Sequence, residues 1–194
     1  NNITLENTNY IGELDGSRSE RVQRLADAFN STGLGTNVVD NIQQVLWEKL
    51  TQIANAAGWS ISCEIGNHEL TFPDAMVLRE GSEHYLAVAR ELLSVYKALG
   101  YTPQNFYAPV SKLKELDSLD DEQALETIVS IGQGILDSGY RGRTSMHEDI
   151  LRGKKTEIDY ILKPFIDKAA ELGLEVPTVV ACYRIIKVLD HYLK

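Results

Sequence analysis

The chain has 194 residues, 24% of them charged, and a formal net charge of −9. This acidic balance argues against nucleic-acid binding, which needs a basic face, and no run approaches the roughly 18 apolar residues that cross a membrane. Asn1–Thr4 lack the basic start and apolar stretch of a signal peptide, so Cys63 and Cys182 are expected to be reduced thiols in a cytoplasmic protein.

The first 40 residues are predicted to form a short α/β segment. Residues 2–14 read as a β-hairpin, because apolar and polar residues alternate on either side of a polar turn. Ser17 and Glu20 have the spacing of a capping box, and the inner face of the helix that follows is predicted to be Val22, Leu25, Ala26 and Phe29. Gly33 ends that helix, and Thr36–Val39 is a short β-rich run. A segment of this size buries little by itself.

Residues 41–57 are predicted to form a helix that Gly58 ends. Its apolar stripe is predicted to consist of Ile42, Val45, Leu46, Ile53, Ala56 and Ala57. At about 100° per residue, Lys49 falls in the middle of this stripe. Two interpretations stay open: the lysine stem packs while its amine reaches water, or the partly buried ammonium has a chemical role.

The remaining chain is predicted to be helical throughout. Helices are expected at 67–77, 80–100, 110–116, 121–137, 156–172 and from Pro177 to about Leu193. Pro164 is expected to kink or restart the fifth of these, and Gly139–Arg143 is expected to be a flexible basic loop. Asn67 reads as an N-cap, with a ligand-facing amide as the alternative. The histidines have no ligand spacing, so no metal site is predicted and His147 is placed on the surface.

The stretch Thr144–Tyr160 joins a Ser-Met pair to the start of an apolar helix through a basic turn that contains one glycine. Thr156 reads as an N-cap whose hydroxyl accepts a hydrogen bond from the amide of Asp159. The acidic residues of this first turn suit the positive end of a helix. That local interpretation does not explain why Ser145 and Glu157 are joined by a glycine-containing basic turn.

A family resemblance rests on four stretches of the sequence. Ser145-Met146, followed by Asp149-Ile150 and by Thr156-Glu157-Ile158-Asp159, resembles the C-terminal signature of ketopantoate reductases (2-dehydropantoate 2-reductases). The resemblance continues at Tyr10–Gly16, Leu46–Leu50 and Gly66–Leu70. It implies a mainly α fold, with residues 41–194 as a helical C-terminal domain like that of 6-phosphogluconate dehydrogenase-type reductases. Residues 1–40 would be an α/β remnant, the C-terminal edge of a Rossmann-like nucleotide-binding domain.

The resemblance also implies an activity and its residues. The full-length protein is expected to be an NADPH-dependent oxidoreductase that reduces the small-molecule 2-keto acid ketopantoate to pantoate, on the pathway to pantothenate and coenzyme A. Lys49 is then the general acid that protonates the carbonyl oxygen. Asn67 and Ser145 donate to substrate oxygens, Glu157 accepts from the substrate hydroxyl, and Asp149 holds the loop.

Cofactor-binding residues are not predicted within this chain. Gly33–Asn37 contains two glycines, but it lacks the third glycine and the preceding buried strand of a dinucleotide-binding loop. NADPH is therefore expected to be bound mainly by a domain absent from this chain, and the chain alone is expected to be inactive.

Two departures from the family pattern leave alternatives open. Ile53 stands where the family commonly has Asn, and Lys163-Pro164 stands where it usually has Asn-Gly. A related 2-keto acid is therefore an alternative substrate. An alternative of another class is a helical module for dimerisation or partner binding, and a homodimer is compatible with either function.

Overall fold

The structure, a computed structural model, describes residues 8–194. The chain forms two compact units. The first unit contains the chain up to Leu50 together with Gln104–Lys112, and the second contains Thr51–Pro103 and Leu113–Lys194.

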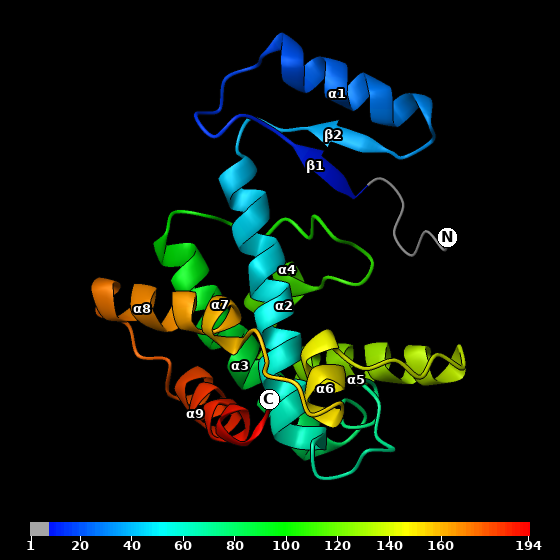
Figure 1. The fold of residues 1–194 in the computed structure, drawn as a ribbon, viewed down its shortest axis with the longest axis vertical. Coiled ribbons are helices and arrows are strands. Elements are labelled where there is room, and N and C mark those ends of the chain that lie inside the picture. Colours follow the sequence, from blue (N-terminus) through cyan, green and yellow to red (C-terminus); the bar gives the residue numbers. More distant parts are fainter. Residues whose placement is uncertain (1–7) are drawn as a thin grey trace. The chain divides into compact units, whose positions relative to one another are not determined.

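The first unit contains a small parallel sheet and a helix (Figure 1). Strand β1 (Asn9–Ile11) pairs in parallel with β2 (Thr36–Val38), and helix α1 (Glu20–Ser31) connects the two strands. A helical crossover returns the chain in the same direction, which is why this pairing is parallel. The predicted hairpin at residues 2–14 lies partly outside the described residues, and its described strand pairs with β2 instead.

The N-cap of helix α1 lies two residues after the predicted one. Ser19 is the N-cap and accepts from the amide of Val22 at 3.3 Å, whereas Ser17 donates its hydroxyl to Asp15 at 2.7 Å. The predicted inner face is only half right, because Val22 and Ala26 are buried while Leu25 and Phe29 are 47% and 39% exposed.

Helix α2 (Ile42–Glu64) contains residues of both units, and it corrects one prediction in full and another in part. It does not end at Gly58, because that glycine is buried where a Cβ atom would lie 3.3 Å from Leu162 and 3.6 Å from the Cβ of Cys182. The predicted stripe is only partly right, since Ile42, Val45 and Ala57 are buried but Leu46 and Ile53 are exposed. The other buried residues of α2 include Glu48, Thr51, Ala54, Asn55, Trp59 and Ser60.

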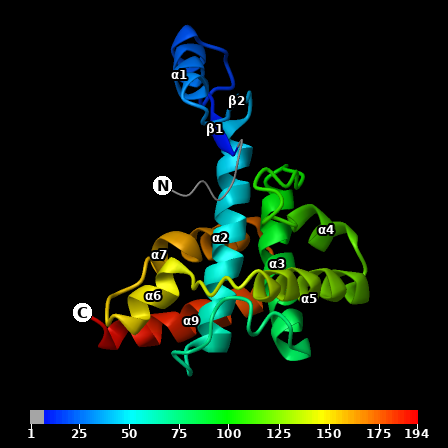
Figure 2. The same ribbon diagram turned by 90° about the vertical axis from the view of Figure 1, so that its right-hand side faces the viewer.

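The second unit is built around α3 (Arg79–Ala98), the predicted 80–100 helix. It contacts α4 (Leu113–Ser118), α5 (Asp121–Asp137), α8 (Lys163–Leu172) and α9 (Pro177–Tyr192). Figure 2 shows α5 crossing α3. The inward side chains Val88, Leu92 and Tyr96 have no exposed surface, so α3 carries the core of this unit.

Local signals set several helix ends correctly. Asp120 caps α5 by accepting from the amide of Gln123. The segment after Thr156 divides into α7 (Ile158–Ile161) and α8, which carries Pro164 in its first turn, as predicted. Gly173 ends α8 with a φ of 68°, and Pro177 begins α9.

Three local predictions in the second unit were wrong. Residues 67–77 form turns, because the oxygen of Asn67 accepts from the amide of Glu69 rather than starting a helix. Residues Ser145–Leu151 form an unpredicted short helix, α6, capped by Thr144. Residues 139–143 are anchored rather than free, since Gly142 accepts from the amide of Phe72 at 2.9 Å. Among residues 8–194, no helix is both long and apolar enough to span a membrane.

Two glycines on α5 provide a matched test of the packing in the second unit. A Cβ at Gly132 would lie 2.7 Å from the Cβ of Met76, whereas no heavy atom lies within 4 Å of one at Gly134. We expect Gly132→Ala to lower the free energy of unfolding by about 1–3 kcal/mol through overpacking. Gly134→Ala should raise it by up to about 1 kcal/mol through helix propensity. Urea unfolding followed by circular dichroism measures both, and effects of the same sign would contradict this packing.

Candidate functional site

Lys49 lies on the first unit's part of α2 and is exposed. This corrects the prediction that it sits within the buried stripe of the helix. Its neighbour Glu48 has no exposed surface, and Val45 is 1% exposed. The helix thus buries the face that contains Glu48 and presents Lys49 to solvent.

Glu48 explains why α2 is oriented in this way. Its carboxylate oxygens accept hydrogen bonds from the backbone amides of Gln104 and Phe106, both at 2.8 Å. A buried carboxylate needs such partners, and hydrogen bonds to a charged acceptor are the stronger kind. Glu48 therefore fixes the 104–107 loop against α2. The only sequence signal for this role was an acidic residue next to Lys49, which did not show where its partners were.

The loop held by Glu48 carries an aromatic group next to Lys49. The Nζ atom of Lys49 lies 5.9 Å from the ring centre of Tyr107, at the outer limit of a cation–π contact. Tyr10 packs edge-to-face on Tyr107 and donates its hydroxyl to the carbonyl of Phe106 at 2.6 Å. Burial raises the pKa of both phenols, and the charge of Glu48 adds to this effect, so both remain protonated at neutral pH.

A hollow of about 330 Å³ in the first unit contains Lys49. Its walls are mostly apolar or aromatic and come from β1, the end of α1, α2 and Tyr107. No salt bridge to Lys49 exists among the described residues. An ammonium in such a setting can bind a carboxylate or donate a proton to a carbonyl oxygen.

Asn67 lies in the second unit, on the turn that follows α2. Its backbone amide donates to the carbonyl of Glu64 at 3.0 Å, and its side-chain oxygen accepts from the amide of Glu69 at 2.9 Å. Because the oxygen is used in this turn, the NH2 end of the exposed carboxamide is the end that can donate to a ligand.

Ser145 is the first residue of α6 and is exposed. Thr144 caps this helix, and its hydroxyl also contacts that of Ser60 at 3.0 Å. Arg143 ties the same segment to the chain after Asn67, donating to the carbonyl of Leu70 at 2.8 Å and to that of His68. The segments that carry Asn67 and Ser145 are therefore bound to each other within the second unit.

Glu157 is exposed at the N-terminus of α7, and no side-chain hydrogen bond caps that helix. Thr156 does not cap the helix through Asp159 as predicted. Its amide and hydroxyl donate to the buried carboxylate of Asp190 at 2.8 and 3.0 Å, and its oxygen accepts from Ile158 at 3.4 Å. Asp190, which sequence reasoning missed, thus fixes the backbone next to Glu157.

The C-terminal residue also anchors the basic turn before Glu157. Lys194 accepts from the amide of Lys155 at 3.2 Å and donates to the carbonyl of Gly153 at 3.1 Å. At the other end of the turn, the carbonyl of Asp149 accepts from Lys154 at 2.8 Å. Backbone bonds at both ends therefore limit the movement of the turn between Ser145 and Glu157.

His147 was predicted to lie on the surface, but it has no exposed area. Its Nδ1 atom lies 3.7 Å from Oε2 of Glu64, which is equally buried. The error arose because the acidic residues that follow His147 suggested a solvated segment, while α6 buries both Met146 and His147. Among residues 8–194, no cluster of three or more His, Cys, Asp or Glu side chains could hold a metal ion.

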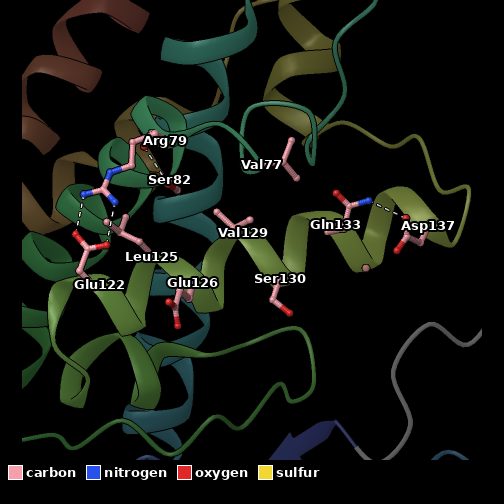
Figure 3. A pocket seen from close by; sticks show the side chains of 11 residues that line it. Val77, Arg79, Ser82, Glu122, Leu125, Glu126, Val129, Ser130, Gln133 and Asp137 are labelled. Carbon is pink, nitrogen blue, oxygen red and sulfur yellow. Dashed lines mark hydrogen bonds and ion pairs between the residues drawn. The ribbon is translucent and has the colours of Figure 1, made fainter.

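A larger groove of about 700 Å³ lies along α5 and contains none of the predicted residues (Figure 3). Its charged groups are largely paired with each other: Arg79 binds Glu122, and Gln133 donates to Asp137. This pairing leaves the groove without a free reactive group comparable to Lys49, so its size alone does not identify it as the functional site.

A family model described as the C-terminal region of ketopantoate reductase PanE/ApbA matches residues 41–190. The chain belongs to this family. The resemblance inferred from the signature is thus confirmed, together with the mainly helical fold that it implied.

Relatives of this ketopantoate reductase domain are larger proteins. The 2-dehydropantoate 2-reductase of Archaeoglobus fulgidus is 25% identical over 172 residues, which are 88% of this chain and 48% of the relative. The chain therefore spans about half the length of the curated relatives that it matches.

Solved structures share the fold. A dimeric ketopantoate reductase from Staphylococcus aureus aligns with a TM-score of 0.64 and 19% identity, covering 90% of this chain and 52% of that one. D-mandelate dehydrogenase with NADH and anilino(oxo)acetate aligns with a TM-score of 0.67 and 16% identity, covering 94% and 66%. At these identities the likeness establishes the fold.

The anchoring role of Glu48 can be tested by Glu48→Gln. We expect the free energy of unfolding to fall by about 1.5–3 kcal/mol, because two backbone amides lose a charged acceptor. Hydrogen exchange at the amides of Gln104 and Phe106 should accelerate. The control is Lys49→Ala, an exposed change that should alter stability by less than about 0.5 kcal/mol. Unchanged exchange in Glu48→Gln would show that the loop does not depend on this carboxylate.

Proposed function

We propose that this chain is the substrate-binding and catalytic half of a reductase that converts ketopantoate to pantoate with NADPH. The family match over residues 41–190 supports the proposal. The observation that carries it is the exposure of Lys49, Asn67, Ser145 and Glu157, all of which are accessible to a substrate.

The setting of these side chains favours a functional role. Lys49, Ser145 and Glu157 each directly precede or follow a residue with no exposed surface, namely Glu48, Met146 and Ile158. A side chain on a backbone anchored by a buried neighbour is held in a limited range of positions. Such preorganisation is what binding and catalytic groups need.

Each residue has a proposed task. Lys49 donates the proton that the carbonyl oxygen gains when its carbon is reduced. Asn67 and Ser145 donate hydrogen bonds to the oxygens of the keto acid, and Glu157 accepts one from its hydroxyl. These roles require one basic, two donating and one accepting side chain, which is the chemistry that the four residues provide.

The hydride comes from the nicotinamide of the proposed cofactor. The Gly33–Asn37 stretch offers no cradle for its phosphates, because Gly33 and Gly35 lie between α1 and β2, whereas a phosphate site needs a turn from strand to helix. We therefore assign NADPH binding to a domain outside this chain, and we expect the chain alone to be inactive.

The role of Lys49 is tested in a chimaera that joins this chain to the part of the Archaeoglobus fulgidus reductase outside the match. Lys49→Ala should lower the turnover of ketopantoate by roughly 10²–10⁴-fold, the usual effect of losing a general acid. Glu157→Ala should act mainly on KM, since a hydrogen bond to a charged group contributes about 1.5–3 kcal/mol. Steady-state oxidation of NADPH measures both parameters.

A control separates lost chemistry from lost folding. Ketopantoate is titrated against this chain alone by NMR, where Lys49→Ala should still fold and Glu157→Ala should bind more weakly. Near-normal turnover in the Lys49→Ala chimaera would remove Lys49 from the mechanism. Absence of turnover in the unmutated chimaera would instead favour the helical partner-binding module.

The substrate itself is tested with trimethylpyruvate, which has the carbon skeleton of ketopantoate without its hydroxyl group. Ile53 lies one turn after Lys49 on α2 and is 39% exposed, so an apolar side chain is available there. If the substrate is a related 2-keto acid, kcat/KM for trimethylpyruvate should equal or exceed that for ketopantoate. Ile53→Asn should then raise kcat/KM for ketopantoate relative to that for trimethylpyruvate by roughly tenfold, because one hydrogen bond contributes about that much. A strong preference for ketopantoate that Ile53→Asn does not alter would establish ketopantoate itself.

A further inference from the structure

The turn that carries Asn67 and the helix that carries Ser145 are linked by several contacts in the second unit. Arg143 donates to the carbonyl of Leu70 at 2.8 Å and also to the carbonyl of His68. A backbone bond of 2.9 Å between Phe72 and Gly142 adds a third link. A shift of one segment is therefore transmitted to the other.

A buried acid–base pair lies where these two segments meet. Glu64 is the last residue of α2, and His147 is the third residue of α6. Both side chains are 0% exposed, so neither can touch a substrate. The closest atoms, Nδ1 of His147 and Oε2 of Glu64, are 3.7 Å apart, so closing about 1 Å would form a hydrogen bond. Neither ring nitrogen of His147 has a hydrogen-bond partner among the described residues.

The surroundings favour the uncharged forms of both groups. Burial raises the pKa of Glu64 to about 8; the amide of Ala75 and the charge of Arg143 oppose this rise, and Asp74 adds to it. Burial and Arg143 lower the pKa of His147, while Glu148 acts in the opposite direction. Near neutral pH the pair therefore holds one proton, on the carboxyl group of Glu64. A protonated carboxyl can donate to the imidazole once the 3.7 Å gap closes, and that hydrogen bond would link α2 to α6.

We propose that Glu64 and His147 are positioning residues whose shared proton holds the Asn67 turn against the Ser145 helix and thereby sets the affinity for a keto acid. The choice of ligand rests on the proposed function. The coupling between the two segments rests on the buried contacts alone.

The direction of the pH dependence follows from the two shifts. The raised pKa of Glu64 means that its stabilising effect is present below the ordinary value of 4.5 and is lost as the pH rises through about 8. The lowered pKa of His147 means that its contribution is present above 6.5 and is lost as the pH falls below it. The two segments should therefore be held most firmly near neutral pH and should loosen when Glu64 ionises.

The coupling is tested by NMR on the whole chain. In the wild type, the His147 ring and the amides of Asn67 and Ser145 should shift together with one midpoint near pH 8. Glu64→Gln should abolish that step. His147→Leu, which removes the acceptor for the Glu64 proton, should abolish the step at the amide of Ser145. The control is Glu126→Gln, which removes an exposed carboxylate from α5 and should leave the step in place. If the amides of Asn67 and Ser145 do not shift near pH 8, or if they still shift in Glu64→Gln, the coupling is refuted.

The predicted effect on keto acid affinity is tested by titrating the same samples with ketopantoate. In the wild type, the affinity for ketopantoate should fall by about fivefold or more as the pH rises through 8. About fivefold is the lower end of the usual range for coupling between two sites. In Glu64→Gln, the affinity should not change over the same pH range. A merely structural pair would lower stability in the variant without removing this pH dependence. An equal pH dependence in both proteins would overturn the positioning role. Absence of ketopantoate binding at every pH would refute the proposed function and the predicted effect on keto acid affinity. The amide shifts would still test whether the two segments are coupled.

Discussion

The buried polar face of α2 is the constraint on which the candidate site depends. Glu48, Thr51 and Asn55 have no exposed surface, although the opposite side of the helix offers the apolar residues Leu46 and Ile53. A carboxylate leaves water only where donors replace it, and the amides of Gln104 and Phe106 do so for Glu48. Once this face is turned inward, Lys49 has to face solvent. The exposure of the proposed acid is thus a consequence of where its neighbour finds hydrogen bonds.

The same principle places the proposed binding groups of the second unit. Ser145 and Glu157 are exposed, but each belongs to a segment tied down by a residue with no direct contact to a ligand. Arg143 anchors the chain before Ser145, and Asp190 anchors Thr156 before Glu157. Both anchors bind backbone atoms, which makes their effect independent of the side chains that they position. Short segments that would otherwise move are thereby given fixed places on a helical scaffold.

Buried charges serve different purposes in this chain. Asp190 is satisfied by two donors from Thr156, so it behaves as a structural anchor. Glu64 and His147 are less well satisfied, since 3.7 Å separates their nearest atoms and burial disfavours the charged form of each. Because burial raises the pKa of Glu64 to about 8, this second kind of group responds to pH within the range where proteins function. This difference is what makes the Glu64–His147 pair a candidate for coupling rather than a simple support.

The sequence by itself determined the features that depend on near neighbours in the chain. The family signature, the cap at Asp120, the restart of the helix at Pro164 and the glycine end at Gly173 are each set by a few consecutive residues. Only the tertiary structure decided the exposed face of α2, the parallel partner of β1 and the burial of His147. The partners that settle these features are remote: Gln104 lies 56 residues from Glu48. Apolar periodicity detects which residues avoid water, but it does not detect a buried polar group whose hydrogen-bond donors come from a distant loop.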